Sequence, residues 1–258
     1  CLMDDIFMAK CFEDNIECTE LVVRIILERD DLKIRQVHAQ HSIKNLQGRS
    51  VILDIFAVDT EGRHYNIEIQ RSDDGAHVKR ARYNSSLIDA NISSPGENYN
   101  KLPESYVIFI TERDVFKSGL PIYHIERVVN ETEKNFGDGS HIIYVNGENR
   151  DDSPIGLLMR DFFCTNPEDM NYTELSERTS YFKNEKKGEA VMSGVIEELL
   201  RETKKETEKE TEERVTRKTA INLIRSETIS IEKISEIMSL PLDEVKRIAE
   251  EIKKADIS

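Results

Sequence analysis

The clearest alternation of hydrophobic and polar positions lies at residues 49–70, which read RSVILDIFAVDTEGRHYNIEIQ. Residues 51–58 are mainly β-branched and aromatic, a composition typical of a strand. A turn follows at residues 60–62, where glycine can adopt a positive φ. Residues 64–70 then alternate strictly, with apolar side chains on one face and polar side chains on the other. The pattern predicts a β-hairpin.

The register of this hairpin places two carboxylates opposite each other. If the turn is centred on Glu61, Asp54 lies across from Glu68, and Gln70 follows on the same face. Opposed residues have Cβ atoms about 4.5–5.5 Å apart, a separation at which like charges destabilise the pair. A divalent cation neutralises such a pair, and Mg²⁺ binds one or two carboxylates together with water and phosphate oxygens.

Two interpretations of the carboxylate pair are open. The residues form a metal site, or they are ordinary acids on a solvated sheet face. Ile52, Phe56 and Val58 alternate in phase with Asp54, which predicts a partly buried face. This favours the metal site, because a buried carboxylate pair needs a partner.

The same residues resemble the PD-(D/E)xK nuclease superfamily and, within it, the bacterial family of recombination-promoting nucleases and transposases. Members carry an Asp on one strand and Glu-x-Gln on the next, which here are Asp54 and Glu68-Ile69-Gln70. Arg80 and Tyr83, in HVKRARYNSSL, match the Arg and Tyr of the helix that follows. The segments LPESYVIFIT and HIIYVNG are similar to the later core strands. The resemblance covers roughly residues 4–181.

The resemblance implies an α/β fold with a restriction-endonuclease-like core, in which helices flank a central mixed β-sheet. It implies a Mg²⁺-dependent DNA endonuclease, in which Mn²⁺ can substitute. Asp54 and Glu68 would be metal ligands, and Gln70 would complete the catalytic set. Gln70 stands where other superfamily members have a lysine, so it can donate hydrogen bonds but carries no charge.

An acid of the first helix often adds a metal contact in this superfamily. Glu20, in a helix predicted over residues 17–29, is the candidate for that contact. The alternative is that Glu20 lies on the surface and pairs with Arg24 one turn later.

The remaining pattern predicts an alternation of helices and strands followed by a helical tail. Helices are expected over residues 4–12, 75–90 and 155–163, and strands over residues 32–43, 106–111 and 141–145. His38 and His41 lie close in sequence but lack a third ligand, so we interpret them as ordinary polar residues.

The charge of the chain argues against DNA binding unless a local basic surface exists. The 258 residues include 50 acidic and 36 basic ones, for a net charge of −14, whereas neutralising phosphates dominates nonspecific affinity for DNA. Residues 70–83 are locally basic despite Asp73 and Asp74. We therefore expect the following helix to contact DNA next to the site, unless its basic residues pair with acids; the residues concerned are Lys79, Arg80, Arg82 and Tyr83.

The composition changes after residue 195. We expect a nuclease-like domain over residues 1–195, a charged helical linker over 196–219 and a small tail resembling a helix-turn-helix over 220–258. The linker has no apolar stripe, which is typical of a solvent-bridging helix. The tail balances basic and acidic residues, so packing or oligomerisation is as plausible a role as DNA recognition.

The four cysteines have no CxxC spacing, which argues against a zinc site and indicates free thiols in a reducing bacterial cytoplasm. No apolar run of membrane-spanning length and no signal peptide is found, so no membrane partner is expected. The sequence begins with Cys1 rather than Met, which indicates a truncated or processed start.

Two competing functions remain open. A catalytically inactive nucleic-acid-binding protein of a mobile element would keep the fold and the basic helix. An assembly protein would agree with the acidic charge and the helical tail. A homo-oligomer is a further expectation, because nucleases that cut both strands often dimerise.

Overall fold

The structure is a computed structural model and describes residues 1–45, 48–71, 75–93, 95–225 and 229–255. Within these ranges, the side chains at 199, 202, 205–214 and 253–255 are not part of the description. The chain forms two compact units, Cys1–Met192 and Ser193–Ser258.

The first unit is built on a mixed six-stranded sheet with the order β1-β2-β3-β4-β8-β5. The strands are β1 (Ile34–Ile43), β2 (Val51–Asp59), β3 (His64–Gln70), β4 (Ser105–Thr111), β5 (Ile122–Ile125) and β8 (Ser140–Asn146). Pairing is antiparallel from β1 to β3, parallel from β3 through β4 to β8, and antiparallel between β8 and β5. A separate two-stranded ribbon joins β6 (Val128–Val129) to β7 (Lys134–Asn135).

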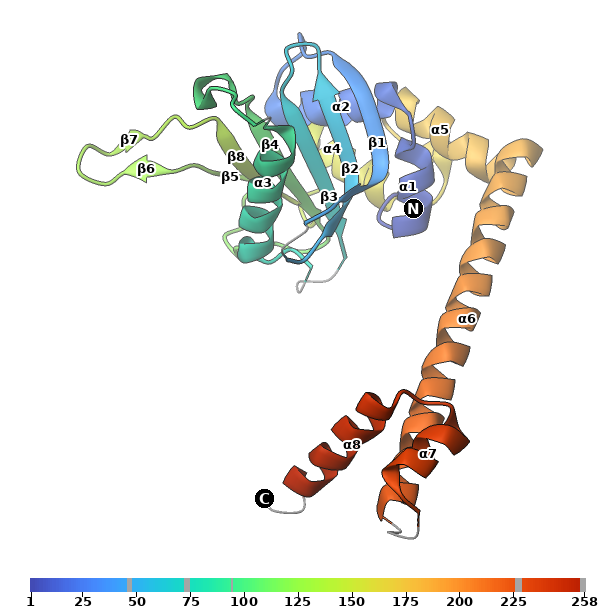
Figure 1. Ribbon diagram of the computed structural model, residues 1–258. Coiled ribbons are helices and arrows are strands. Elements are labelled where there is room, and N and C mark those ends of the chain that lie inside the picture. Colours follow the sequence, from blue (N-terminus) through green and yellow to red (C-terminus); the bar gives the residue numbers. More distant parts are fainter. Residues whose placement is uncertain (46–47, 72–74, 94, 226–228, 256–258) are drawn as a thin grey trace. The chain divides into compact units, whose positions relative to one another are not determined.

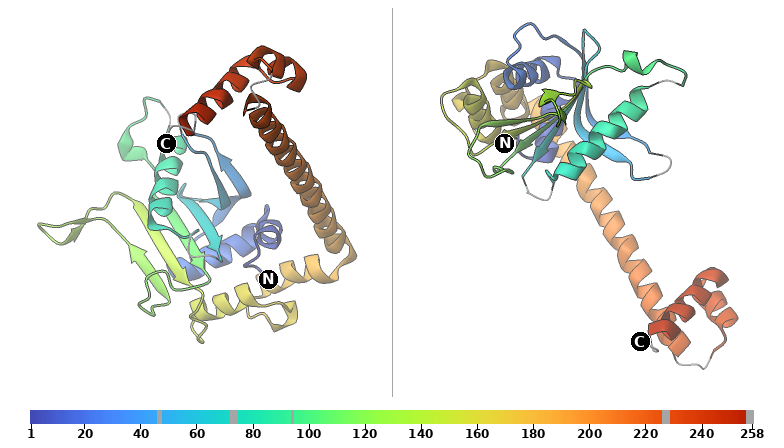
Figure 2. Two further views of the ribbon diagram at one scale, coloured as in Figure 1. Left: turned by 90° about the horizontal axis from the view of Figure 1, so that it is seen from below. Right: turned by 90° about the vertical axis from the view of Figure 1, so that its left-hand side faces the viewer.

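Helices cover both faces of the sheet, as the right-hand view of Figure 2 shows. One face packs against α1, α2, α4 and α5, and the other packs against α3. Their bounds are α1 (Asp5–Phe12), α2 (Ile16–Leu27), α3 (Val78–Ile92), α4 (Pro154–Phe163) and α5 (Thr173–Asn184), with short 3₁₀ turns η1 (Tyr99–Lys101) and η2 (Pro167–Asp169). This is the restriction-endonuclease-like arrangement that the resemblance implied (Figure 1).

Most elements of the first unit lie within a few residues of their predicted positions. The strand expected at 32–43 begins at Ile34, and the helix expected at 75–90 runs from Val78 to Ile92. The short strands β5, β6 and β7 and the helix α5 are absent from the predicted set, because they are too short or too irregular in pattern. The four cysteines are free thiols, as predicted.

The register of the β2–β3 hairpin is confirmed. Ile55 pairs with Ile67 and Val58 pairs with His64, so the hairpin is centred on Glu61. Asp59 fixes this turn with a carboxylate that is almost fully buried. It accepts hydrogen bonds from Glu61 N (2.9 Å), Arg63 N (2.8 Å), Arg63 Nε (2.8 Å) and the Tyr65 hydroxyl (2.9 Å).

The expectation that Ile52 lies on the same buried face of β2 as Phe56 and Val58 is wrong. Ile52 is 56% exposed, whereas Leu53 is buried in the same cluster as Phe56. Leu53 and Phe56 are three residues apart, so the alternation slips by one residue at Asp54. Gln40 faces this point on β1 and has a φ of 51°, a left-handed conformation that breaks the alternation of its own strand.

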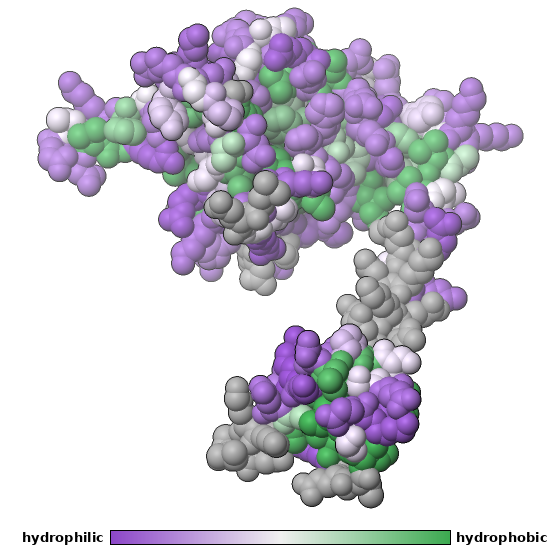
Figure 3. Space-filling model, in the orientation of Figure 1, coloured by the Kyte–Doolittle hydropathy of each residue, from purple (hydrophilic) through white to green (hydrophobic). Residues whose placement is uncertain are grey.

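The second unit begins inside α6 (Lys186–Arg225) and continues with α7 (Ile231–Met238) and α8 (Leu242–Ala255). Ser230 caps α7 by accepting a hydrogen bond from Lys233 N. Hydrophobic side chains gather where the helices meet, and charged side chains surround them (Figure 3). The buried ones are Ala220, Ile234, Val245, Ile248 and Ala249. The division into a linker and a tail stays a prediction.

In the described part of the chain, no helix is both long and apolar enough to cross a membrane.

We expect Asp59→Ala to lower the free energy of unfolding by about 3 kcal/mol, because the buried Tyr65 hydroxyl and Arg63 lose their acceptor. Tyrosine fluorescence in urea measures this in the first unit alone, since every tyrosine of the chain precedes Ser193. Glu61→Ala, in the same turn but exposed, is the matched control and should unfold as the wild type does.

The same carboxylate gives the hairpin a pH dependence. Burial raises the pKa of Asp59, but the hydrogen bonds from Arg63 and Tyr65 outweigh burial and hold this pKa below its ordinary value of 3.8. A lowered folded-state pKa contributes stability above the unfolded-state pKa, and this stability is lost as the pH falls through the folded-state value. When the pH is lowered from neutral to pH 3, the free energy of unfolding of Asp59→Asn should therefore decrease less than that of the wild type. An equal decrease in both proteins would show that Asp59 is not the source of the pH dependence.

Candidate active site

Asp54 and Glu68 lie next to each other at the open end of the hairpin. They are the next residues along β2 and β3 after the paired residues Ile55 and Ile67. Asp54 Oδ2 accepts a hydrogen bond of 2.9 Å from Ile69 N, which ties its carboxylate to the peptide after Glu68. Glu68 has no exposed surface. The structure thus brings together the two acids that the sequence predicted to be opposed.

Arg80 is the cation nearest this pair. Its Nη2 donates to Glu68 Oε2 at 2.5 Å, and its Nη1 donates to the Gly75 carbonyl at 3.1 Å. The guanidinium carbon lies 6.0 Å from the centre of the Phe109 ring. Arg80 comes from the first turn of α3, so the docking of this helix determines where its guanidinium lies.

The two carboxyl groups titrate well above their ordinary range. Burial raises the pKa of Asp54 to about 6, opposed by the Ile69 hydrogen bond and the charge of Arg80. Burial and then the charge of Asp54 raise the pKa of Glu68 to about 7, opposed by Arg80. The fixed cation therefore does not fully compensate the two acids.

The residues present fit a divalent cation. Glu68 Oε1 is buried and has no hydrogen-bond partner in the described part of the chain. A buried carboxylate oxygen without a donor is costly unless a ligand satisfies it. Two adjacent carboxylates with a spare oxygen match the preference of hard divalent cations for oxygen ligands.

A polar stripe continues from Glu68 beneath α3. Asn66 precedes Glu68 on the same face of β3, and Asn84 follows Arg80 by one turn on α3. Both amide groups are buried and make no hydrogen bond of ordinary geometry among the described residues, although the Asn66 amide is close enough to Glu68 to lower the pKa of that carboxyl. Ordered water satisfies such groups in most proteins.

Gln70 ends β3, and its position depends on Gly75. A Cβ atom at residue 75 would lie 1.7 Å from Gln70 Oε1, so only glycine leaves room for this amide. Gln70 is therefore held close to the loop that leads to α3. Asp73 and Asp74, which belong to that loop, lie outside the described residues.

The residues expected to bind DNA separate into two groups. Lys79 and Arg82 are exposed on α3. Arg80 and Tyr83 are engaged within the protein: the Tyr83 hydroxyl donates to the Arg49 carbonyl at 2.5 Å and accepts from Asn45 Nδ2 at 3.1 Å. Tyr83 thus ties α3 to the β1–β2 connection.

Glu20 is not brought to the carboxylate pair. Its oxygens pair with Arg24 (2.7 Å) and Lys33 (3.3 Å) and accept a hydrogen bond from Ile34 N (2.8 Å). Among the described residues, no group of three His, Cys, Asp or Glu side chains could hold a metal ion. The arrangement agrees with the alternative interpretation of Glu20, in which it pairs with Arg24.

Asp5 is an acid near the site that the sequence reasoning missed. Its negative charge raises the pKa of Asp54, which places α1 within electrostatic range of the pair. The signal was present in the sequence: the expectation of an acid on the first helix was applied to α2, whereas Asp5 begins α1. Asp5 increases the negative potential that attracts a cation.

Residues 25–154, about half of the chain, match the model of a family described as PD-(D/E)XK nuclease family transposase. The chain belongs to this family. The matched region contains Asp54, Glu68, Gln70 and the whole of α3, and it excludes α1 and the second unit. None of the curated proteins and none of the solved structures searched matches the chain.

Membership of the PD-(D/E)XK nuclease family transposases supports a nuclease-like or transposase-like protein. PD-(D/E)XK nucleases typically use divalent metals. Both statements agree with a carboxylate pair that has a spare oxygen.

We expect Arg80→Ala to destabilise the first unit by about 2 kcal/mol, because Glu68 loses its charged donor while it stays buried. Arg82→Ala removes the same charge from an exposed position two residues later and should leave stability unchanged. Tyrosine fluorescence in urea compares the two variants. Equal stability of both would show that the Glu68–Arg80 contact does not hold α3 on the sheet.

Proposed function

We propose that the chain is a Mg²⁺-dependent endonuclease that hydrolyses phosphodiester bonds in DNA. The observation that carries this proposal is the pair Asp54–Glu68, in which Asp54 is half-buried, Glu68 is fully buried and one oxygen of Glu68 has no partner among the described residues. Asp54 and Glu68 would hold the metal, and Mn²⁺ could replace Mg²⁺ because both are octahedral and prefer oxygen ligands.

A bound divalent cation would polarise the phosphate and lower the pKa of an attacking water. The residues of the protein would contribute by holding the reacting groups in position. The Ile69 peptide and Arg80 fix the two carboxylates, and Gln70 would orient the water or a phosphate oxygen through its amide group. Burial keeps bulk water from Glu68, which strengthens the electrostatic interactions of its carboxylate.

Lys79 and Arg82 are the proposed contacts to the phosphate backbone. Both are exposed on the helix whose first turn holds Glu68, so a strand that reaches the site passes close to them. Each cation that contacts a phosphate displaces a bound counterion, so the affinity should decrease as the salt concentration rises. The net charge of −14 opposes DNA binding at a distance. Cleavage of both strands would need two sites, which favours a homo-oligomer on DNA. The free thiols agree with the reducing bacterial cytoplasm expected for the protein.

Cleavage of a supercoiled plasmid in Mg²⁺ tests the proposal. We expect Asp54→Ala and Glu68→Gln each to reduce the cleavage rate by about a thousandfold, because they remove a ligand of the proposed metal. Glu20→Ala is the matched control, since it removes an acid that is held by ion pairs away from the site, and it should cleave as the wild type does. Equal cleavage by the wild type and Asp54→Ala would refute the assignment.

Calorimetry with Mn²⁺ separates the enzyme from a catalytically inactive DNA-binding protein. Binding that is lost in Glu68→Gln supports the enzyme. The absence of metal binding by the wild type, together with retained DNA binding, would favour the inactive protein instead.

Gln70 gives a second test of the same site. We expect Gln70→Ala to reduce the rate by about a hundredfold, the effect of losing one positioned donor near developing charge. Gly75→Ala should act in the same direction, because its Cβ would displace the Gln70 amide. Gln70→Lys, which supplies the positive charge found in the wider superfamily, should cleave faster than Gln70→Ala. If all three variants match the wild type, Gln70 takes no part in the reaction.

A further inference from the structure

A cavity of about 370 Å³ opens on the face of the sheet that carries Glu68, beyond the C-terminal half of α3. Figure 1 shows α3 lying over β4, with β1 and β2 to the right of it, and α3 also contacts β1. Ile88 and Ile92 of α3 form one wall, and Phe56 and His64 lie on the sheet side. The cavity is separate from the carboxylate pair but lies on the same strand, β3.

Aromatic rings form a ladder along this face. His38 lies 5.7 Å from His41, His41 lies 4.8 Å from Phe56, and Phe56 lies 5.6 Å from His64, measured between ring centres. The His41 and Phe56 planes differ by 14°. The break in alternation at Gln40 allows His38 and His41 to share the face, although they are three residues apart. Such a platform accepts a further flat ring by stacking.

The polar groups of the cavity suit a nucleobase. Burial lowers the pKa of His41 and the pKa of His64, so both imidazoles are neutral near pH 7 and can each donate and accept a hydrogen bond. His64 Nδ1 is buried and has no partner in the described chain. The amides of Gln36 and Asn91 also line the cavity and offer both donors and acceptors.

Arg35 supplies positive charge at the mouth of the cavity. It is exposed, and it has no ion pair within the described ranges. It lies at a register shift between Ile34 and Gln36, an irregularity of the kind that redirects a side chain. Arg35 and His64 both line the cavity, and no acidic residue is among its lining residues. Burial and then the charge of Arg35 lower the pKa of His64, opposed by the charge of Asp59. A guanidinium beside an aromatic platform matches a phosphate joined to a base.

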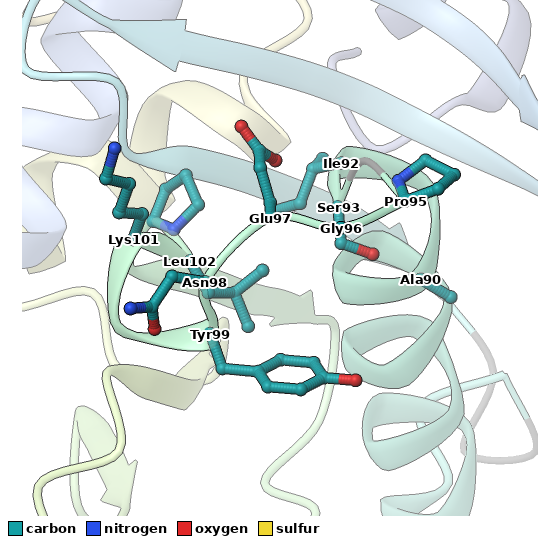
Figure 4. A pocket seen from close by; sticks show the side chains of 11 residues that line it. Ala90, Ile92, Ser93, Pro95, Gly96, Glu97, Asn98, Tyr99, Lys101 and Leu102 are labelled. Carbon is teal, nitrogen blue, oxygen red and sulfur yellow. The ribbon is translucent and has the colours of Figure 1, made fainter.

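A neighbouring cavity of about 350 Å³ shares Ile92 but is less suited to an anion (Figure 4). Glu97 and Lys101 lie on one side of its loop and the Tyr99 ring lies on the other. The carboxylate offsets the lysine, so this second cavity offers no net positive charge.

We propose that the cavity between β1, β3 and α3 binds one unpaired nucleobase of a DNA strand together with its phosphate; the choice of DNA rests on the proposed function. Glu68 follows His64 by four positions on β3, about 13 Å along the strand. A strand gripped here by one base would thus present a phosphate a few nucleotides away to the carboxylate pair. The nuclease would then favour DNA with unpaired or easily frayed nucleotides over intact duplex.

Fluorescence anisotropy of the full chain in EDTA, where cleavage does not occur, tests the binding step. The probes are a short labelled oligothymidine and an abasic strand of the same length. We expect the wild type to bind oligothymidine about tenfold more tightly than the abasic strand, the effect of one base stacked on an aromatic platform. Equal affinity for the two strands would overturn the proposal.

Variants assign the preference to the cavity. His41→Ala should abolish the discrimination between the two strands, whereas His41→Phe, which keeps a ring on Phe56, should retain it. Arg35→Ala should weaken the binding of the oligothymidine and of the abasic strand by a similar factor. Lys134→Ala, which removes an exposed cation from the ribbon that follows the opposite sheet edge, should bind as the wild type does. A preference that persists in His41→Ala would also overturn the proposal.

A free nucleotide also combines a base with a phosphate, so it is the alternative ligand for this cavity. Unlabelled dTMP should displace the oligothymidine only at concentrations well above the Kd of the strand, because the strand also contacts the protein elsewhere. If dTMP displaces the oligothymidine at a concentration as low as the Kd of the strand, the assignment to DNA is overturned. The test is independent of catalysis: Glu68→Gln should lose plasmid cleavage and keep the preference for bases. If the wild type discriminates between the strands but does not cut DNA, the proposed function fails and the base site stands.

Discussion

A carboxylate with no exposed surface needs a cation beside it, and the cation of Glu68 comes from the first turn of α3. This single contact joins the two halves of the site. The hairpin supplies both acids, and the helix supplies the positive charge that pairs with the buried Glu68. The same guanidinium holds the Gly75 carbonyl and thereby fixes the approach to the helix. The exposed cations of α3 are placed by the same docking, so the geometry of the site and that of its basic surface depend on each other.

The two units have different structural foundations. The first unit combines a mixed sheet with cores on both of its faces, and its catalytic candidates lie on the strands and helix at the centre of that layering. The second unit is helical, and the side chains described there bury a small group of aliphatic residues. The family match covers the sheet with the carboxylate pair and does not reach the second unit. The residues of the proposed chemistry therefore lie in the first unit.

The hairpin could be predicted because its determinants are local. Strict alternation and a glycine-containing turn define the register, and the structure has the same register. The slip at Asp54 could not be predicted, because it depends on how Gln40 of the neighbouring strand is folded. The roles of Arg80 and Glu20 also depend on tertiary packing: both are charged residues on helices, and the sequence does not show which of them reaches Glu68. The histidines of β1 looked like isolated polar residues, since the ring ladder forms only when three strands lie side by side.

The hairpin also has a consequence for the order of folding. Its two strands are joined by a short turn, so their contacts close small loops and form with little entropic cost. The parallel pairings of β3, β4 and β8 need long crossover connections and form more slowly. We therefore expect the two acids to meet while the hairpin is still in water, where their repulsion is screened, and α3 to cover them afterwards. When α3 docks, Glu68 leaves water. At that step its carboxylate must either pair with Arg80 or take up a proton, so the burial of this one charge should limit how readily α3 docks.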